Sequence, residues 1–230
     1  NMTKEEMINL GKKLGADVAL VVAPYYNKPS SEGIFRHYEQ ISKVGIPILV
    51  YNIAGRTGIN IATSTLERIA NLPNICGVKE ASGDINQMMQ VISTIKSKNP
   101  DFSVLSGDDG LTLPLVSVGG DGVVSVVSNL TPSLVAQMTN AALDGDFEKA
   151  RDLHYRLLPF FKAAFVDGNP SSIKYAMNLT TKNGNTCVLK ENLIEHVSNI
   201  LSVSKELVEN EFTALCYAKE LYIENGYAFL

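Results

Sequence analysis

The run Ile46–Ile53, IPILVYNI, decides the fold class, because it is apolar, rich in β-branched residues and uninterrupted. Continuous apolar runs are typical of strands that are covered on both faces of a parallel sheet. Similar runs occur on either side of it in the chain: ADVALVVAP (16–24), ICGVKEAS (75–82), SVLSGDD (103–109) and GVVSVVSN (122–129). The five runs are centred near residues 20, 49, 78, 106 and 125. These separations match the length of a βα unit, with the last unit shorter.

Helical segments are predicted between the runs. Ser31, Thr63 and Asp84 begin such segments, and Asp84 can accept a hydrogen bond from a backbone N–H of the first turn. After residue 130, three further segments read as helices: 132–143, 146–165 and 171–179. Alternating strands and helices require parallel pairing with right-handed crossovers. Two architectures fit, an open doubly wound sheet and part of an eight-stranded (β/α) barrel, and the number of strands alone favours the first.

The composition excludes several classes of protein. Hydrophobic residues make up 45% and charged residues 19% of the 230 residues, which argues against a disordered chain. The net charge of −4 and the absence of a basic stripe argue against nucleic-acid binding. Three widely spaced cysteines, Cys76, Cys187 and Cys216, form no disulfide framework and favour a reducing, cytoplasmic location. No apolar run is long enough for a membrane helix, and the first residues lack a signal-peptide pattern.

Lys79 is the most informative single residue. It closes an apolar run at the carboxyl end of a predicted strand, where the sites of parallel α/β folds lie. A lysine amine that has lost its water becomes the neutral nucleophile needed to attack a carbonyl. The structural alternative is a lysine that reaches solvent or pairs with Glu80 or Asp84.

Other polar side chains fall at the same ends of the predicted strands. Tyr51 closes the preceding run, so its hydroxyl is expected near the Lys79 amine as a proton shuttle. Arg56 follows in a glycine-bracketed loop and could hold a carboxylate, or form a loop salt bridge. Tyr25 and Tyr26 form an aromatic pair at a strand exit, which fits a site, a subunit contact or both.

No metal or dinucleotide site is predicted. Asp108 and Asp109 are adjacent carboxylates without a nearby histidine, and they fit a helix cap better than a metal site. The glycines form no G-x-G-x-x-G after the first strand.

Five motifs in order carry a resemblance to a known family: PYYNKP (24–29), YNIAGRTG (51–58), GVKEASG (77–83), SGDD (106–109) and GVVSV (122–126). In these motifs the chain resembles the dihydrodipicolinate synthase / N-acetylneuraminate lyase family, whose members are eight-stranded (β/α) barrels. The resemblance implies a TIM barrel of which this chain holds about five of the eight βα units. Arg56 resembles the synthase branch, which condenses pyruvate with aspartate semialdehyde in lysine (diaminopimelate) biosynthesis. The sialic acid lyase branch lacks that arginine.

The resemblance also implies a role for each matching residue. Lys79 would form a covalent imine with pyruvate, so that no separate cofactor is needed, and Tyr51 would relay protons. Tyr26 resembles the tyrosine that completes the relay across a dimer interface. Six further residues have counterparts: Arg56 binds the second substrate, Gly107 and Val124 surround pyruvate, and Tyr25, with Asn1 and Glu5, belongs to the interface and to an effector pocket for lysine.

Departures from the family pattern define the expected domain limits. The first three strands of the family, with a Gly-Thr-Thr-Gly-Glu loop that grips the pyruvate carboxylate, have no counterpart here. Ala54 stands where the family usually has proline, and the stretch after about residue 180 is expected to be unrelated to the family. We therefore expect a partial barrel with its C-terminal helices over residues 1–179 and a divergent, mainly helical tail over 180–230. The chain is expected to be a fragment of a longer protein or to assemble differently.

The expected activity is that of a class I, Schiff-base lyase or synthase. The expected partners are pyruvate, aspartate semialdehyde, lysine as an inhibitor and further copies of the chain, in a dimer of dimers. Two alternatives remain. One is a sister aldolase acting on N-acetylneuraminate or a keto-sugar acid, and the other is a catalytically silent, truncated member of the family.

Overall fold

The apolar runs form a five-stranded parallel sheet in the computed structural model of the chain. Its strands are β1 (Ala19–Val22), β2 (Ile48–Asn52), β3 (Ile75–Glu80), β4 (Ser103–Ser106) and β5 (Gly122–Val123). The structure describes residues 3–181, 187–189, 222–224 and 227–229. All five strands were predicted from the sequence, at positions within the predicted runs.

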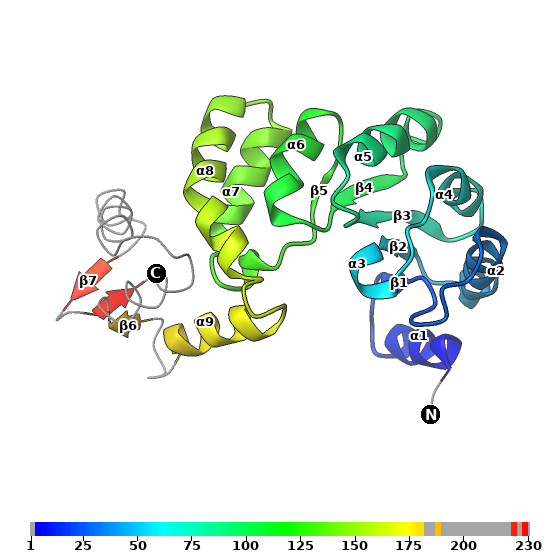
Figure 1. The fold of residues 1–230 in the computed structure, drawn as a ribbon, viewed down its shortest axis with the longest axis horizontal. Coiled ribbons are helices and arrows are strands. Elements are labelled where there is room, and N and C mark those ends of the chain that lie inside the picture. The colour runs from blue at the N-terminus through cyan, green and yellow to red at the C-terminus, as the bar shows by residue number, and fades with distance from the viewer. Residues whose placement is uncertain (1–2, 182–186, 190–221, 225–226, 230) are drawn as a thin grey trace. The chain divides into compact units, whose positions relative to one another are not determined.

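The strand order distinguishes between the two predicted architectures. The order is β1-β2-β3-β4-β5, so that each strand pairs with the next in the chain and the order never reverses (Figure 1). Right-handed crossovers that always step the same way place every helix on the same side of the sheet. A doubly wound sheet needs a reversal of the order, which puts helices on both faces. The order therefore indicates part of a barrel wall and not an open doubly wound sheet.

Helices cover the outer face of this sheet, each packed against the next. They include α2 (Ser31–Ile41), α4 (Thr63–Ala70), α5 (Ile85–Val91) and α6 (Thr112–Ser117). Helix α2 contacts α4, α4 contacts α5 and α5 contacts α6, so the helices follow the strand order (Figure 1). Two further helices belong to the same part of the chain, α1 (Lys4–Lys13) and the short α3 (Ala54–Thr57).

The helix starts have identifiable causes. The Ser30 hydroxyl accepts a hydrogen bond from Gly33 N at the start of α2, and the Asp84 carboxylate accepts one from Asn86 N at the start of α5. Helix α4 begins at Thr63, as predicted, without a side-chain cap. Helix α1 was not predicted, although Thr3 and Glu6 form a capping box at its start.

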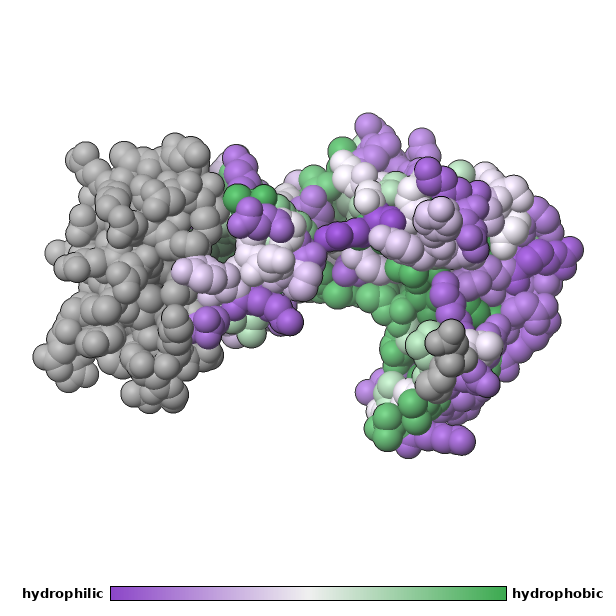
Figure 2. Space-filling view, turned by 60° about the horizontal axis from the view of Figure 1, so that its bottom comes forward, coloured by the Kyte–Doolittle hydropathy of each residue, from purple (hydrophilic) through white to green (hydrophobic). Residues whose placement is uncertain are grey.

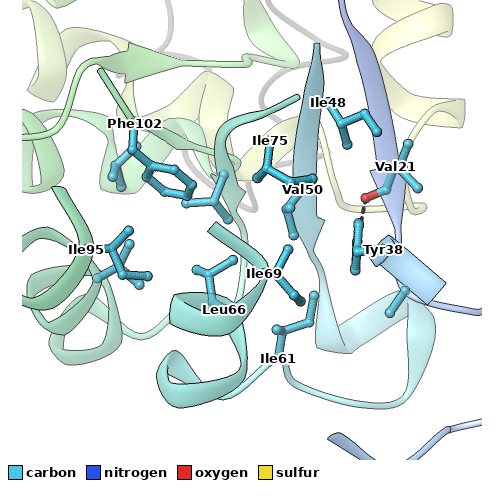
Figure 3. Packing of buried hydrophobic residues seen from close by; sticks show 14 of the residues in the cluster. Val21, Tyr38, Ile48, Val50, Ile61, Leu66, Ile69, Ile75, Ile95 and Phe102 are labelled. Carbon is cyan, nitrogen blue, oxygen red and sulfur yellow. Dashed lines mark hydrogen bonds between the residues drawn. The ribbon is translucent and has the colours of Figure 1, made fainter. Parts of the chain in front are cut away.

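The hydrophobic core lies between the sheet and these helices. Figure 3 shows Leu66 and Ile69 of α4 beside Val50 and Ile75 of the strands. Of these, Leu66, Ile69 and Val50 are fully buried. Tyr38 of α2 is also fully buried, and its hydroxyl donates to the Val21 carbonyl oxygen at 2.7 Å, which ties α2 to β1. Burial of these apolar faces fixes the helices on one side of the sheet.

Apolar side chains remain exposed elsewhere in the same part of the chain. Leu20 of β1 is 46% exposed, and Met7 and Leu10 of α1 are also exposed. Figure 2 shows apolar surface, in green, gathered on one side of the described residues. Leu20 and Leu49 alternate with the core residues of their strands, so they lie on the face of the sheet opposite to the helices.

The chain divides into two compact units. The first unit comprises residues 1–124 and 142–145 and contains the five-stranded sheet. The second comprises residues 125–141 and 146–230. It contains most of α7 (Pro132–Leu143), together with α8 (Phe147–Ala163) and α9 (Ser171–Thr181). These three helices match the segments predicted from the sequence. No helix among the described residues has the length and apolar character needed to cross a membrane.

The predicted helical tail lies mostly outside the described residues. Those that are described form three short strands, β6 (Cys187–Leu189), β7 (Tyr222–Glu224) and β8 (Tyr227–Phe229). They pair antiparallel in the order β6-β8-β7. The sequence reading did not predict these strands.

Gly77 provides a test of the sheet. It pairs with Ser103 of β4, and a Cβ at position 77 would lie 2.3 Å from the Ser103 carbonyl oxygen. We expect Gly77→Ala to lower the free energy of unfolding by about 3 kcal/mol, because overpacking against backbone forces β3 and β4 apart. Urea unfolding followed by circular dichroism measures the change. Gly55→Ala is the control, since its added Cβ meets no atom within 4 Å. Equal unfolding midpoints for the two variants would contradict the packing argument.

Candidate functional site

Strands β2 and β3 bring Lys79 and Tyr51 together. The two residues are partners in the parallel register, so their side chains leave the same face of the sheet. Lys79 Nζ lies 4.1 Å from the centroid of the Tyr51 ring, a cation–π geometry. The sequence predicted that these side chains would be neighbours, and the structure places them so.

An irregularity in the strand pairing produces this juxtaposition. Ile48 pairs with Ile75, but Leu49 pairs with Gly77, so the register shifts by a residue at that point. Without the shift, Tyr51 would pair with Val78, and Lys79 would share a face with Asn52. A shift of a single residue exchanges the two faces of a strand, so the bulge decides which side chain lies beside the lysine.

Lys79 is buried without a carboxylate partner. Only 8% of it is exposed, and no ion pair joins it to Glu80, Asp84 or another acidic group of the described residues. Glu80 accepts hydrogen bonds from Asn52 and Ser82, and Asp84 caps α5. The structure therefore argues against the alternative of a surface lysine or a structural ion pair, since a buried lysine without a partner is rare outside functional sites.

Gly107 leaves space for the lysine side chain. It follows β4, and its N–H donates to the Glu80 carbonyl oxygen at 2.7 Å. A Cβ at position 107 would lie 3.0 Å from Lys79 Cε and 2.5 Å from Ala81 Cβ. The absence of a side chain is thus required for the observed position of Lys79. Nearby, the Val124 N–H donates to the Ser106 carbonyl oxygen at 2.9 Å, which extends the pairing of β4 with β5.

Arg56 and the two tyrosines lie on exposed segments that follow β2 and β1. Arg56 lies on α3, directly after β2, and is exposed. Tyr25 and Tyr26 are 61% and 86% exposed, and Tyr26 adopts a positive φ of 73°. Exposed aromatic side chains suit contact with another chain. The interface role of Tyr25 and Tyr26 stays a prediction.

The predicted effector residues are at the amino-terminal end of the chain. Asn1 lies outside the described residues. Glu5 is exposed in the first turn of α1. Its neighbour Lys4 places Nζ 3.3 Å from His37 Nε2, and burial, with the Lys4 charge, lowers the pKa of His37 to about 4.

Asp108 acts as a cap, as predicted. Its carboxylate accepts a hydrogen bond from Gly110 N at the start of the short 3₁₀ helix Asp109–Leu111. Within the described residues, no three His, Cys, Asp or Glu side chains are grouped as a metal ion would need.

The sequence reading missed a buried polar cluster beside the lysine. Asn52 and Glu80 are paired in register and fully buried. Burial raises the pKa of the Glu80 carboxyl, and the nearby Asp84 charge adds to the rise, while hydrogen bonds from Asn52 and Ser82 oppose it. The signal in the sequence was the position of both residues, each following a predicted site residue at a strand end.

A comparison with a protein-family model covers most of the chain. The dihydrodipicolinate synthetase family matches residues 2–196. The chain belongs to this family. Its fold class is therefore the TIM barrel of the family, of which the described residues contribute five parallel strands.

Curated relatives and solved structures agree with this assignment. The 4-hydroxy-tetrahydrodipicolinate synthase of Protochlamydia amoebophila is 54% identical over 179 residues, which are 77% of this chain and 60% of that protein. The one of Archaeoglobus fulgidus is 47% identical over 169 residues, 73% of this chain and 57% of that protein. The crystal structure of the Thermotoga maritima dihydrodipicolinate synthase is 40% identical with a TM-score of 0.77, covering 86% of this chain and 70% of that one. The chain thus spans about 60% of the length of the first of these curated relatives.

Gly107→Ala tests whether this glycine positions Lys79. The added methyl group must displace the lysine side chain, so we expect Lys79 to become several-fold more reactive towards reductive methylation by formaldehyde. Peptide mass mapping measures the labelling of Lys79 relative to the other lysines. Gly11→Ala is the control, because its added Cβ has only an ordinary contact at 3.8 Å. Unchanged labelling of Lys79 in a folded Gly107→Ala protein would contradict the role of Gly107.

Proposed function

We propose that this chain provides the Schiff-base site of a 4-hydroxy-tetrahydrodipicolinate synthase, which condenses pyruvate with aspartate semialdehyde. The observation that carries the proposal is the Lys79 amine, buried without a carboxylate partner and 4.1 Å from the Tyr51 ring centroid. Membership of the family and the names of the curated relatives support the choice of reaction.

The chemistry follows from the placement of the amine. The Lys79 nitrogen attacks the keto carbon of pyruvate, and the carbonyl oxygen leaves as water to give an imine. Loss of a methyl proton then gives an enamine, whose carbon attacks the aldehyde carbon of aspartate semialdehyde. Each step moves a proton, and the Tyr51 phenol is the proposed shuttle, with Tyr26 of a second copy completing the relay. The imine is the covalent link to substrate, so no separate cofactor is invoked.

Arg56 is the proposed anchor for the second substrate. A guanidinium can hold the carboxylate of aspartate semialdehyde by two parallel hydrogen bonds. Gly107 and Val124 contribute backbone around the bound pyruvate. The names of the curated relatives favour this assignment over a sister aldolase for N-acetylneuraminate or a keto-sugar acid.

Regulation and assembly form the outer part of the proposal. A solved relative from Cyanidioschyzon merolae is described with lysine bound. We propose lysine as an inhibitor here also, with Tyr25, Glu5 and Asn1 at its pocket, and a dimer of dimers in the cytoplasm. The exposure of Tyr25 and Tyr26 supports an interface at this segment.

Trapping with pyruvate and borohydride tests the central claim. We expect a reduced pyruvate adduct on Lys79, identified by intact mass and peptide mapping, and its loss in Lys79→Arg, which keeps the charge but removes the nucleophile. Tyr51→Phe should slow adduct formation by about 100-fold, because the proton shuttle is gone. Lys43→Ala, at an exposed lysine, is the control. Absence of the adduct from protein shown to be folded would favour the silent family member instead.

Arg56→Ala tests the second substrate. We expect kcat/KM for aspartate semialdehyde to fall by about 10- to 100-fold, since a charge-assisted hydrogen bond contributes about 1.5–3 kcal/mol. The rate of pyruvate adduct formation should not change. Arg36→Ala is the matched control, because Arg36 is an exposed residue of α2 paired with Glu32 and Glu39. Equal loss for both substrates would contradict the assignment of Arg56 to the aldehyde.

A further inference from the structure

A buried carboxyl group lies directly behind the Schiff-base lysine. Glu80 is fully buried, and it follows Lys79 in β3, so its side chain leaves the opposite face of the sheet. Its register partner is Asn52, which follows Tyr51 in β2 and is equally buried. The pair of proposed catalytic residues, Tyr51 and Lys79, thus lies on one face of the sheet. The next pair along the same two strands, Asn52 and Glu80, lies on the other face.

Asn52 belongs to a closed circuit of hydrogen bonds. Its Oδ1 accepts from Ile61 N at 3.0 Å, and its Nδ2 donates to Asn60 Oδ1 at 2.7 Å. Asn60 Nδ2 donates to Gln87 Oε1 at 2.7 Å, and Gln87 Nε2 donates back to the Ile61 carbonyl oxygen at 2.8 Å. The circuit joins β2, the segment before α4, and α5, so it fixes the direction in which the Asn52 amide points.

Glu80 is connected to this circuit only as an acceptor. Asn52 Nδ2 lies 3.0 Å from both Glu80 carboxyl oxygens, and Ser82 N donates to Oε1 at 2.8 Å. No lysine or arginine of the described residues forms an ion pair with it. Burying a carboxyl group without a cation lowers stability. If only stability mattered, an apolar residue could stand in its place. The presence of Glu80 at this position therefore points to a function.

The backbone that directly follows Lys79 is hydrogen-bonded in two directions, to β2 and to the residue after β4. Ala81 N donates to the Asn52 carbonyl oxygen at 2.8 Å, and Gly107 N donates to the Glu80 carbonyl oxygen at 2.7 Å. The residues that follow Lys79 are therefore attached to β2 and β4 by their backbone, and to Asn52 and Ser82 by the Glu80 side chain. The Lys79 side chain makes no hydrogen bond among the described residues, so its position depends on the backbone that carries it, which these attachments hold.

We infer that Glu80 is a positioning residue for Lys79: its carboxylate, bonded to Asn52 and Ser82, holds the ends of β2 and β3 in the register that places the Lys79 amine over the Tyr51 ring. The inference rests on the proposed function for its catalytic meaning. It makes a structural claim that holds separately, namely that the amine position depends on the charge and polarity of the group behind it.

Glutamine at position 80 tests this inference with little change of volume. Its amide has a single oxygen, whereas Glu80 presents both oxygens to the donor Asn52 Nδ2 and one to Ser82 N. Whichever way the amide turns, an N–H group faces another donor. Asn52 cannot turn to compensate without losing its bond from Ile61 N. Glu80→Gln therefore breaks the polar match while the shape is kept.

The experiment compares three variants of the 230-residue chain. Glu80→Gln is the main variant. Asn60→Ala is a milder one at an exposed residue, which removes an acceptor of Asn52 and should leave the chain folded. Ile41→Val is the matched control, because it removes a buried methyl group at the end of α2 and leaves every hydrogen bond of the Asn52 and Glu80 side chains in place. For each variant we would measure thermal unfolding and the reductive methylation of Lys79. We would also measure the rate of borohydride-trapped imine formation at saturating pyruvate and the pyruvate concentration that gives half of this rate.

A positioning role predicts a specific pattern. The maximal rate of imine formation should fall by about 10- to 100-fold in Glu80→Gln, since misplacement by about 1 Å has an effect of this size. The half-maximal pyruvate concentration should change by less than about twofold, while Lys79 methylation should rise. Asn60→Ala should show the same pattern more weakly. Ile41→Val should lower the unfolding temperature and leave both readouts of Lys79 unchanged.

Two results separate this inference from the proposed function. If the unchanged chain forms no imine, the proposed function fails for it, and the methylation of Lys79 alone decides the positioning role. If Glu80→Gln, or Asn60→Ala where the first does not fold, leaves both imine formation and Lys79 methylation unchanged, the inference is overturned. It is also overturned if Ile41→Val at equal loss of stability reproduces both changes.

Discussion

The pairing of β2 with β3 is the constraint on which the rest of this structure depends. Parallel strands that share a register also share faces, so the partner of each residue is decided once the hydrogen bonds are made. A shift of the register between Ile48 and Leu49 places Tyr51 opposite Lys79 and Asn52 opposite Glu80. Tyr51 and Lys79 thereby meet on the face away from the helices, and Asn52 and Glu80 meet on the face that the helices cover.

At two positions beside this pairing, close packing leaves no room for any residue larger than glycine. Gly77 lies at the register shift and admits the Ser103 carbonyl oxygen, which brings β4 close to β3. Gly107 follows β4 and leaves room for Lys79 Cε. Strand β3, which carries Lys79, is consequently held by both of its neighbours, β2 and β4.

The two faces of the sheet surround their buried polar side chains differently. On the helix-covered face, Glu80 is surrounded by donors that satisfy both of its oxygens, so a polar group is retained in a rigid arrangement. On the other face, Lys79 is buried against an aromatic ring and a glycine, and it forms no ion pair with an acidic side chain of the described residues. The Lys79 side chain is thus largely excluded from water, as the proposed Schiff-base chemistry requires.

The sequence by itself determined the alternating α/β class, the five strands and the residues at their carboxyl ends, and the resemblance of its motifs implied a barrel. Continuous apolar runs and their separation depend on local composition, and the motifs around Lys79, Tyr51 and Arg56 are short and contiguous. Helix α1 and the short strands after residue 181 were not predicted, because their patterns are brief and give little periodic signal. Only the tertiary structure decided that the strand order never reverses, that a bulge aligns Tyr51 with Lys79, and that Asn52, Asn60, Gln87 and Glu80 form one hydrogen-bonded polar cluster. These features depend on contacts between residues far apart in the chain, and single-residue differences in pairing leave no trace in hydrophobic periodicity.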